Sequence, residues 1–280
     1  MKYQIETYRN FGRCLRVEHG NLELYATLDL GPRIIRFNLI GHDNIFYEQP
    51  DELNELCSEG GWRLYGGHRL WVSPETDLMY WPDNKPVAYA VDEDSITFTG
   101  TPNEYQGLEM SITLRFLDDN TVSAEHTARK VSGDSMRCAA WALSVMDDGA
   151  VAHIPWKGTP GGLTPTRFLS LWSDTSLADE RICFKDDKVI FSQLPHKDEY
   201  FKVGLWCGDM TAVCYSKGQA FIKTISVVDG AIYPDNHMNV EIFICRHMLE
   251  YETLGPLTDL VNIGDTCTHT EIWKLEKDNR

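Results

Sequence analysis

The chain has 280 residues, of which 42% are hydrophobic and 24% are charged, and its formal net charge is −16 at pH 7. This composition is ordinary for a folded globular protein and excludes a long disordered chain. A strongly acidic surface repels nucleic-acid phosphates and anionic lipid headgroups, so we expect neither a nucleic acid nor a membrane as a partner.

The N-terminal residues, MKYQIETYRNFGRCLRVEHG, contain no apolar segment typical of a signal peptide, and no run in the chain approaches the ~18 apolar residues of a membrane span. The eight cysteines are irregularly spaced, several lie in apolar runs, and no spacing with histidine indicates zinc. We therefore expect a cytoplasmic protein with reduced, buried thiols, no metal and no other cofactor. Nothing in the sequence predicts its oligomeric state.

In chain order, the first predicted elements are two strands, over 21–31 and 32–41, separated by a Gly-Pro break. A short helix is expected over 50–61, PDELNELCSEGG, because an aspartate near its start and two glycines at its end are typical helix boundaries. The segment 65–75, YGGHRLWVSPE, is too polar for a core strand, and we expect an ordered loop there.

Farther along, 111–130 predicts a hairpin, because two alternating runs flank an Asp-Asp-Asn turn. The Gly-, Pro- and Trp-rich segment 151–174 is expected to be a long loop. Further strand-like runs are separated by turn residues and cover 95–102, 138–146, 188–194, 201–208, 210–228, 238–255 and 267–276. Many short strands, few helices and no linker predict an all-β protein, a large antiparallel sandwich forming one domain over 1–280.

The segment 65–75 has the residue types of a sugar site. Gly66 and Gly67 leave the backbone uncovered, so that a ligand or a second chain segment can approach closely. His68 can serve as a general acid or base, and Arg69 can donate two parallel hydrogen bonds to vicinal hydroxyls or a carboxylate.

Two further residues of this segment suit the same ligand. Trp71 can stack on the apolar face of a pyranose, and Glu75 can accept hydrogen bonds from its hydroxyls. The structural alternative is that His68 and Glu75 only satisfy backbone groups of a tight loop.

The segment 249–257, LEYETLGPL, contains a candidate catalytic base. Strand alternation places Glu250 and Glu252 on one face and Tyr251 and Thr253 on the other. We expect Glu250 to form an edge salt bridge and Glu252, just before the Gly-Pro turn, to be the base.

Three candidates come from 231–243, AIYPDNHMNVEIF: Tyr233, Asn239 and Glu241 are expected to bind a ligand, and Asn239 and Glu241 share a strand face. Lysines also lie in two apolar strand runs, at Lys202 and Lys223. Such lysines usually point to solvent, but one that points to a binding face donates to hydroxyls or anions, and we take Lys223 as the candidate.

Together these motifs resemble the aldose 1-epimerase-like, or galactose mutarotase-like, proteins. LDLGPRIIRFNLIGHDNIFYE (28–48) resembles their early strand pair, YGGHRLWVSPE their Gly-Gly element, and LEYETLGPL with THTEIWKL their closing strands. The order and spacing match over nearly the whole chain. The resemblance implies a galactose mutarotase-like β-supersandwich that binds a small-molecule sugar on a concave face.

The resemblance also implies a mechanism, in which a glutamate takes the proton of the anomeric hydroxyl and a histidine protonates the ring oxygen. By position Glu252 matches the base, and His68 and Arg69 match residues that hold the sugar. The strand that carries the acid histidine in the family corresponds to 138–149, CAAWALSVMDDG, which contains no histidine. His153 or His68 is then the candidate acid.

Two other functions remain open at this point. A glycoside hydrolase or lyase would use Glu75 and Glu252 as its carboxylate pair. A non-catalytic carbohydrate-binding or sensing protein would need no acid histidine, and the tryptophans would serve to stack on the sugar.

Overall fold

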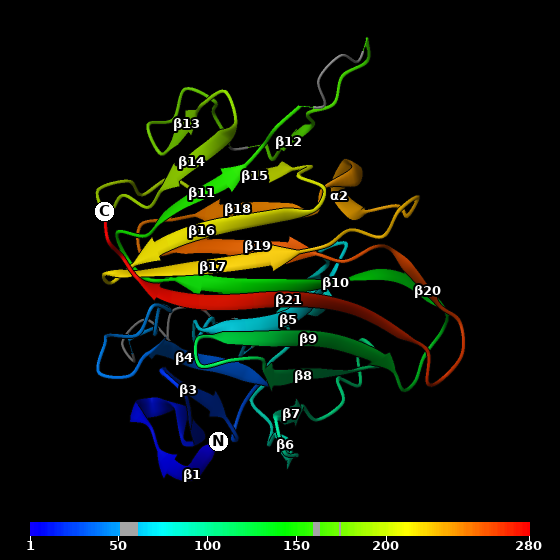
Figure 1. Ribbon diagram of the computed structural model, residues 1–280. Helices are drawn as coiled ribbons and strands as arrows, with labels where there is room; N and C mark the ends of the chain where they lie inside the picture. Colours follow the sequence, from blue (N-terminus) through cyan, green and yellow to red (C-terminus); the bar gives the residue numbers. More distant parts are fainter. Residues whose placement is uncertain (51–60, 159–162, 174) are drawn as a thin grey trace.

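The computed structural model describes residues 1–50, 61–158, 163–173 and 175–280 (Figure 1). Within these ranges the chain forms two large antiparallel sheets that run alongside each other. Helical turns are few and short: η1 (Arg9–Phe11), η2 (Asp77–Tyr80) and α2 (Pro234–His237). The predicted all-β sandwich is therefore confirmed.

The first sheet, sheet 1, takes strands from both ends of the chain. Its order in space is β1 (Lys2–Thr7), β2 (Arg13–His19), β3 (Leu22–Thr27), β4 (Arg33–Leu39), β5 (His68–Ser73), β10 (Met136–Met146), β19 (Leu249–Leu254), β18 (Val240–Ile244), β15 (Phe201–Leu205) and β12 (Leu169–Leu171), with β20 (Thr258–Leu260) beside β10.

The second sheet, sheet 2, is built mainly from the middle of the chain. Its order is β13 (Ile182–Phe184), β14 (Lys188–Ser192), β11 (Val151–Pro155), β16 (Met210–Ser216), β17 (Gln219–Ile225), β21 (Thr266–Lys277), β9 (Thr121–Lys130), β8 (Leu108–Phe116), β7 (Ser95–Thr99) and β6 (Ala88–Val91). The predicted hairpin is confirmed, because β8 and β9 pair in antiparallel register across the Asp-Asp-Asn turn.

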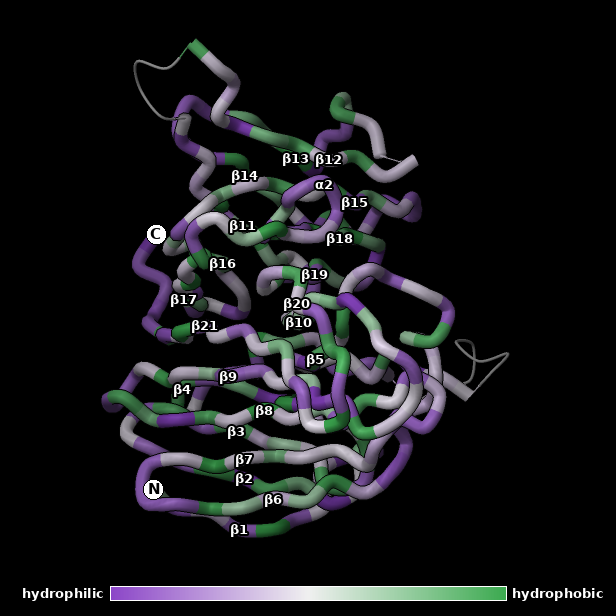
Figure 2. Tube along the Cα trace, turned by 90° about the vertical axis from the view of Figure 1, so that its right-hand side faces the viewer, coloured by the Kyte–Doolittle hydropathy of each residue, from purple (hydrophilic) through white to green (hydrophobic). Residues whose placement is uncertain are grey.

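The core lies between the sheets because one face of each strand is apolar. Hydrophobic and hydrophilic residues alternate along strands such as β8 and β9 (Figure 2). Phe37 on β4 and Phe46, which follows β4, pack against Phe221 and Trp273 of sheet 2. Their ring centroids are 5.5–6.3 Å apart. Each buried aromatic of this kind contributes roughly 1.5–3 kcal/mol by leaving water.

Two expectations about chain segments were wrong. The segment predicted as a loop at 65–75 contains β5, a strand inside sheet 1 whose six residues are all buried. Its polar side chains are tolerated because they find partners on both faces of the sheet. The expected long loop at 151–174 begins with β11 and contains β12. The helix expected over 50–61 lies outside the described residues, apart from its first and last positions.

The Gly66–Gly67 pair is explained by backbone packing. Both residues have positive φ, and a Cβ built on Gly66 would lie 2.0 Å from the carbonyl oxygen of Tyr47. A Cβ on Gly67 would lie 2.6 Å from the carbonyl oxygen of Ile34. The close neighbour at these glycines is therefore a second chain segment, one of the two partners that the sequence suggested.

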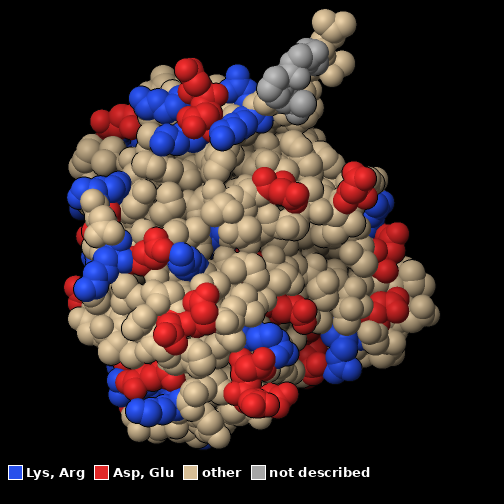
Figure 3. All heavy atoms as spheres, viewed as in Figure 1, with Lys and Arg blue, Asp and Glu red and all other residues tan. Residues whose placement is uncertain are grey.

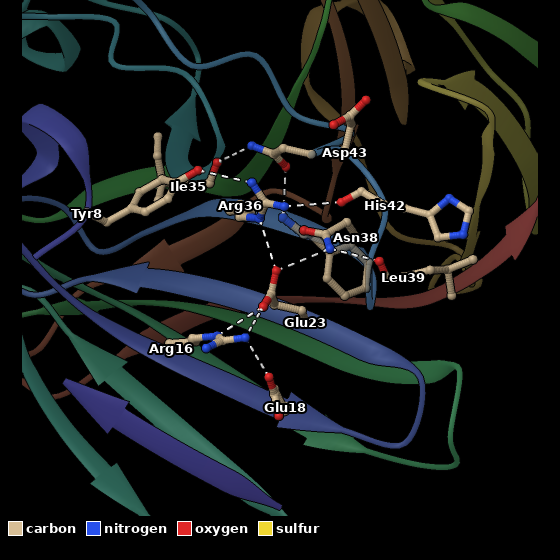
Figure 4. Close-up of polar contacts among 12 residues, drawn as sticks. Tyr8, Arg16, Glu18, Glu23, Ile35, Arg36, Asn38, Leu39, His42 and Asp43 are labelled. Atoms are coloured by element: carbon tan, nitrogen blue, oxygen red, sulfur yellow. Dashed lines mark hydrogen bonds and ion pairs between the residues drawn. The ribbon is translucent and has the colours of Figure 1, made fainter. Parts of the chain in front are cut away.

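A ladder of polar side chains covers the face of β2–β4 that points away from the core (Figure 4). Arg16 pairs with Glu18 and Glu23, and Arg36 reaches Glu23 on its other side. Asn38 donates to the same carboxylate at 3.3 Å. Because each charge has a partner within this ladder, we interpret it as structural.

The seven cysteines in the described ranges are all free thiols. Four of them are buried, as expected, whereas Cys183 is exposed. None of the helices in the described part of the chain has the length and hydrophobicity of a membrane span.

Candidate active site

A cavity of about 450 Å³ opens on the face of sheet 1 that points away from sheet 2. The strands that form its floor, β5, β10, β19, β18 and β15, are consecutive in the sheet. Register fixes which side chains share this face: Arg69 on β5 is opposite Leu143 on β10, which is opposite Glu252 on β19. Glu252 in turn is opposite Glu241 on β18.

Aromatic side chains line most of the cavity. They come from β5, β10, β18 and the connecting segments, and they are Tyr47, Trp62, Trp71, Tyr80, Trp141, Tyr200 and Phe243. Trp71 is central, with ring centroids of Trp62, Tyr80 and Trp141 at 5.9, 5.4 and 5.7 Å. Walls of this kind suit the apolar faces of a sugar ring.

One ammonium group lies among three carboxylates at this site. Lys202 on β15 places its Nζ 3.1 Å from Glu241, 3.7 Å from Glu252 and 3.7 Å from Glu75. The Nε1 of Trp141 donates to the Oε2 of Glu252 at 2.8 Å. Glu241 and Glu252 are almost fully buried, whereas the side chain of Glu75 is 37% exposed.

Burial and the neighbouring charges together set the proton affinities of these groups. It raises the pKa of Glu252 well above its usual range, although the charge of Lys202 opposes the shift. Burial likewise raises the pKa of Glu241 to about 7, again against Lys202. Burial alone would lower the pKa of Lys202, but the carboxylates of Glu252, Glu241 and Glu75 outweigh it and raise that pKa above its usual range.

A second charged pair, Arg69 and Glu250, lies on the same face. The Nη2 of Arg69 is 3.4 Å from Glu250, and its guanidinium carbon is 4.2 Å from the centre of the Trp71 ring. The Nε and Nη1 of Arg69 are buried without a hydrogen-bond partner, as are the Oε1 atoms of Glu241 and Glu252. Unmade hydrogen bonds of buried groups cost free energy, so these atoms are the ones that a polar ligand would satisfy.

The structure brings together five of the residues singled out from the sequence: Arg69, Trp71, Glu75, Glu241 and Glu252. Arg69, Trp71 and Glu75 line the cavity, and Glu241 and Glu252 contact Lys202, which also lines it. The predicted alternation of β19 is confirmed, because Glu250 and Glu252 share this face.

His68 on β5 of sheet 1 and Lys223 on β17 of sheet 2 both lie between the two sheets, away from the cavity. The Nδ1 of His68 is 2.8 Å from the Oγ of Ser144, and its Nε2 is 2.6 Å from the Nε2 of His126. Lys223 donates to Ser144 at 3.0 Å and forms an ion pair with Glu271 at 2.8 Å. Neither His68 nor Lys223 reaches the cavity, because alternation turns them inward.

Ligand atoms of His68, His126 and Glu271 lie within 4.8 Å of one another, a grouping that the sequence did not reveal. Lys223 already compensates the charge of Glu271. A metal ion here would add positive charge beside a fully buried ammonium group, which is costly. We therefore interpret the grouping as a buried hydrogen-bond network of the core.

His153 lies on β11 of sheet 2, where it contacts Tyr215 and lines a separate open depression with Arg280. It is therefore not beside Glu252.

Basic and acidic residues are interspersed over the surface seen in Figure 3, without a patch of one sign.

Tyr233 and Asn239 are held by backbone groups. The hydroxyl of Tyr233 accepts a hydrogen bond from the amide of Val228 at 2.9 Å. The side chain of Asn239 accepts from the amide of Cys207 and donates to the carbonyl of Gly208. The polar side-chain atoms of both residues are therefore used in hydrogen bonds to the backbone. These bonds position the chain segment before β18.

Sequence reasoning did not select several residues that line the cavity. The sequence does not distinguish Lys202 from Lys223, because both lysines lie in similar apolar strands. Trp141 and Tyr80 carry no motif that marks them. His247, in the turn between β18 and β19, is an exposed histidine that lines the cavity. The sequence feature that could have marked His247 is its position in the turn just before the strand that carries Glu252.

No protein-family model and no curated protein matches this sequence. Solved structures do match it. A putative aldose 1-epimerase from Klebsiella pneumoniae has a TM-score of 0.65 at 11% identity, over 99% of this chain and 83% of that chain. A galactose mutarotase-like protein from Lactobacillus casei has a TM-score of 0.58 at 10% identity, over 94% of this chain and 100% of that one.

A third similar structure, the Slr1438 protein from Synechocystis, has a TM-score of 0.62 at 10% identity, over 94% of this chain and 96% of that chain. At such low identity these likenesses show the fold alone. The chain has the galactose mutarotase-like fold that its motifs implied.

Proposed function

We propose that this chain, with its galactose mutarotase-like fold, binds a sugar in the cavity of sheet 1 and interconverts the sugar's anomers, as an aldose 1-epimerase-like isomerase. The observation that carries the proposal is the buried Oε1 of Glu252, which has no hydrogen-bond partner and belongs to the residue that matches the family's base. A sugar hydroxyl is the simplest donor for such an atom.

In this proposal Glu252 is the general base. Its carboxylate takes the proton of the anomeric hydroxyl while a proton is delivered to the ring oxygen, so the C1–O5 bond breaks and an open-chain aldehyde forms. Rotation about C1–C2 and closure on the other face then give the second anomer. Burial raises the pKa of Glu252, so its carboxylate form accepts a proton more strongly than a free glutamate, and the charge of Lys202 favours that form.

The ring oxygen needs a donor, and β10 supplies no acid, since Trp141 and Leu143 occupy the side of β10 that faces the cavity beside Glu252. We assign this part to Lys202, because its Nζ lies 3.7 Å from Glu252. The anomeric hydroxyl and the ring oxygen share one carbon, so base and donor must lie a few ångströms apart. Lys202 would donate a charge-assisted hydrogen bond to the ring oxygen and transfer its proton there as the C1–O5 bond breaks. Ring closure then returns that proton to Lys202 and the proton on Glu252 to the oxygen on C1.

Arg69 and Trp71 would hold the sugar. The free Nε and Nη1 of Arg69 point to different sides of the guanidinium, so each suits one hydroxyl oxygen, and the Trp71 ring suits the apolar face of a pyranose. A sugar held in this way would orient its anomeric carbon toward β19.

The test is exchange spectroscopy by NMR on an equilibrium mixture of anomers. The protein is expected to accelerate α/β exchange, and Glu252→Gln to lower the rate by about 10²–10⁴-fold, the usual contribution of a general base. Glu276→Gln is the matched control, since Glu276 is a solvent-exposed carboxylate paired with Lys274 on sheet 2. Binding without faster exchange would contradict isomerisation and leave a sugar sensor.

The donor is tested in the same way. Lys202→Met is expected to slow exchange, whereas His247→Ala is expected to leave it within about threefold of the parent rate. The opposite pattern would reassign proton delivery to His247, which lines the same cavity. Glu75 and Glu252 both contact the ammonium of Lys202, so the carboxylate pair that glycoside hydrolysis needs also lies at this site. Hydrolysis of a glycoside by the parent protein would favour that function instead.

A further inference from the structure

The charges at the cavity are not balanced. Carboxylates of Glu75, Glu241 and Glu252 surround the single ammonium of Lys202, and Arg69 is already paired with Glu250. Asp235 also lies beside Glu241, so five carboxyl groups meet two cations. A further cation beside Glu241 and Glu252 would favour their charged forms and so oppose the rise that burial gives to the pKa of both groups.

The buried atoms of this site that lack a hydrogen-bond partner include both acceptors and donors. Glu241 is 1% exposed and Glu252 is fully buried, and each has one carboxyl oxygen that accepts no hydrogen bond. Arg69 has unpartnered donors at Nε and Nη1. A ligand that satisfies this set must donate to the carboxylates and accept from the guanidinium.

Aromatic rings enclose the cation that is already present. The Nζ of Lys202 lies 4.5 Å from the centre of the Trp141 ring and 4.8 Å from that of Trp172. Electron-rich faces combined with carboxylates attract ammonium groups, as in the aromatic cages that recognise cationic ligands. The same surroundings disfavour a phosphate or a carboxylate on the ligand, since both cations are already paired.

We propose that the sugar bound in this cavity is a protonated amino sugar, with its ammonium group against the carboxylates of Glu241 and Glu252 and its hydroxyl oxygens on Arg69. This inference rests on the proposed function for the sugar itself and adds the charge of the substrate. It excludes sugar phosphates and uronates as substrates.

Binding constants for matched sugars test it. Glucosamine and galactosamine are compared by NMR titration with glucose and galactose, with their N-acetyl derivatives, and with glucose 6-phosphate and glucuronate. The amino sugars are expected to bind at least about tenfold more tightly than the neutral parents, and the anionic sugars more weakly than either. Equal affinity for amino and neutral sugars, or tight binding of an anionic sugar, would overturn the inference.

Variants separate the charge from the shape of the site. Glu241→Gln removes one negative charge at nearly constant volume, and the ratio of amino-sugar to neutral-sugar affinity is expected to fall by about tenfold. Glu276→Gln on the other sheet is expected to keep the ratio. If Glu241→Gln does not fold, Glu75→Gln serves instead, because its partly exposed side chain contributes less to the core. An unchanged ratio in the folded variant would contradict the proposal.

Anomer exchange recorded in the same samples separates the two proposals. Faster exchange of neutral and amino sugars alike, with equal affinities, would keep the isomerase and reject the amino-sugar preference. Binding of amino sugars without exchange would keep the preference and reject the isomerase. If no sugar of any charge binds, both proposals fail.

Discussion

Glu75 and Glu252 are the same residue type on either side of one lysine, and their surroundings make them different. Glu252 is fully buried, receives a hydrogen bond from Trp141, and has a pKa raised by burial. Glu75 is partly exposed and accepts a hydrogen bond from the hydroxyl of Tyr80. Sequence alternation placed Glu250 and Glu252 on one face correctly, but burial, which sets the proton affinity, depends on neighbours from other strands.

At the same scale, Gly66 is predicted to be intolerant of any side chain. Gly66→Ala is expected to destabilise the fold by about 2–4 kcal/mol, since the strain of positive φ is joined by a clash with the Tyr47 carbonyl. Gly133→Ala is the control, with positive φ but nothing within 4 Å of its Cβ, and it is expected to cost only ~1–2 kcal/mol. Equal losses in urea denaturation would show that backbone conformation alone matters.

At the scale of elements, the two-residue period of a strand decides which face a side chain occupies. On β5 it sends His68 into the core and Arg69 to the cavity, one residue apart. Lys202 on β15 and Lys223 on β17 have similar local sequences, yet they belong to different sheets and point to different places. The local sequence pattern predicts the same environment for both lysines. Only the pairing of their strands decides that Lys202 faces the cavity and Lys223 the core.

The buried pair on β17 and β21 gives a prediction for these elements. Lys223→Met is expected to lower the free energy of unfolding by about 3–5 kcal/mol, because it leaves Glu271 charged and unpaired in the core. The double variant Lys223→Met/Glu271→Gln is expected to recover part of the loss. Lys274→Met, which breaks an exposed pair on β21, should change stability by no more than ~1 kcal/mol. Similar losses for both lysines in urea denaturation would refute the distinction.

For the whole molecule, the interior between the sheets is more polar than the sandwich pattern suggests. His68, His126 and His269 are buried, and burial lowers the pKa of each, to about 3 for His269. Burial raises the pKa of Glu271, but Lys223 and the three histidines together outweigh it and keep that pKa below its usual range. All four folded-state pKa values are depressed, so stability falls as pH falls below the unfolded pKa of each group. The histidines then oppose folding, whereas Glu271 loses the stabilisation that its charged form provides.

The sign follows from linkage. Between the unfolded histidine pKa of ~6.5 and the folded value of about 3, the unfolded chain binds more protons at His269, so stability falls as pH falls. At pH 5 the loss from this residue alone is roughly 2 kcal/mol relative to pH 7.5. The other buried histidines act in the same direction, and Glu271 adds its loss below the unfolded glutamate pKa of ~4.3.

Urea denaturation at pH 7.5 and pH 5 measures the effect. The wild-type protein is expected to be less stable at pH 5, and His269→Asn, which keeps a polar partner for Thr253, should reduce the difference by about 2 kcal/mol. An unchanged difference in the variant would show that His269 does not titrate as inferred.

The sequence by itself determined the fold class, the hairpin at 111–130, the shared face of Glu250 and Glu252, and the resemblance of the motifs to the mutarotase fold, since these depend on local periodicity and spacing. Tertiary structure decided the rest: that 68–73 is a buried strand, that Lys202 and not Lys223 faces the cavity, and that His68 and His153 lie away from Glu252. The physical reason is that the side of a strand that faces the core, and the partners that a side chain finds there, depend on which strands pair across the chain.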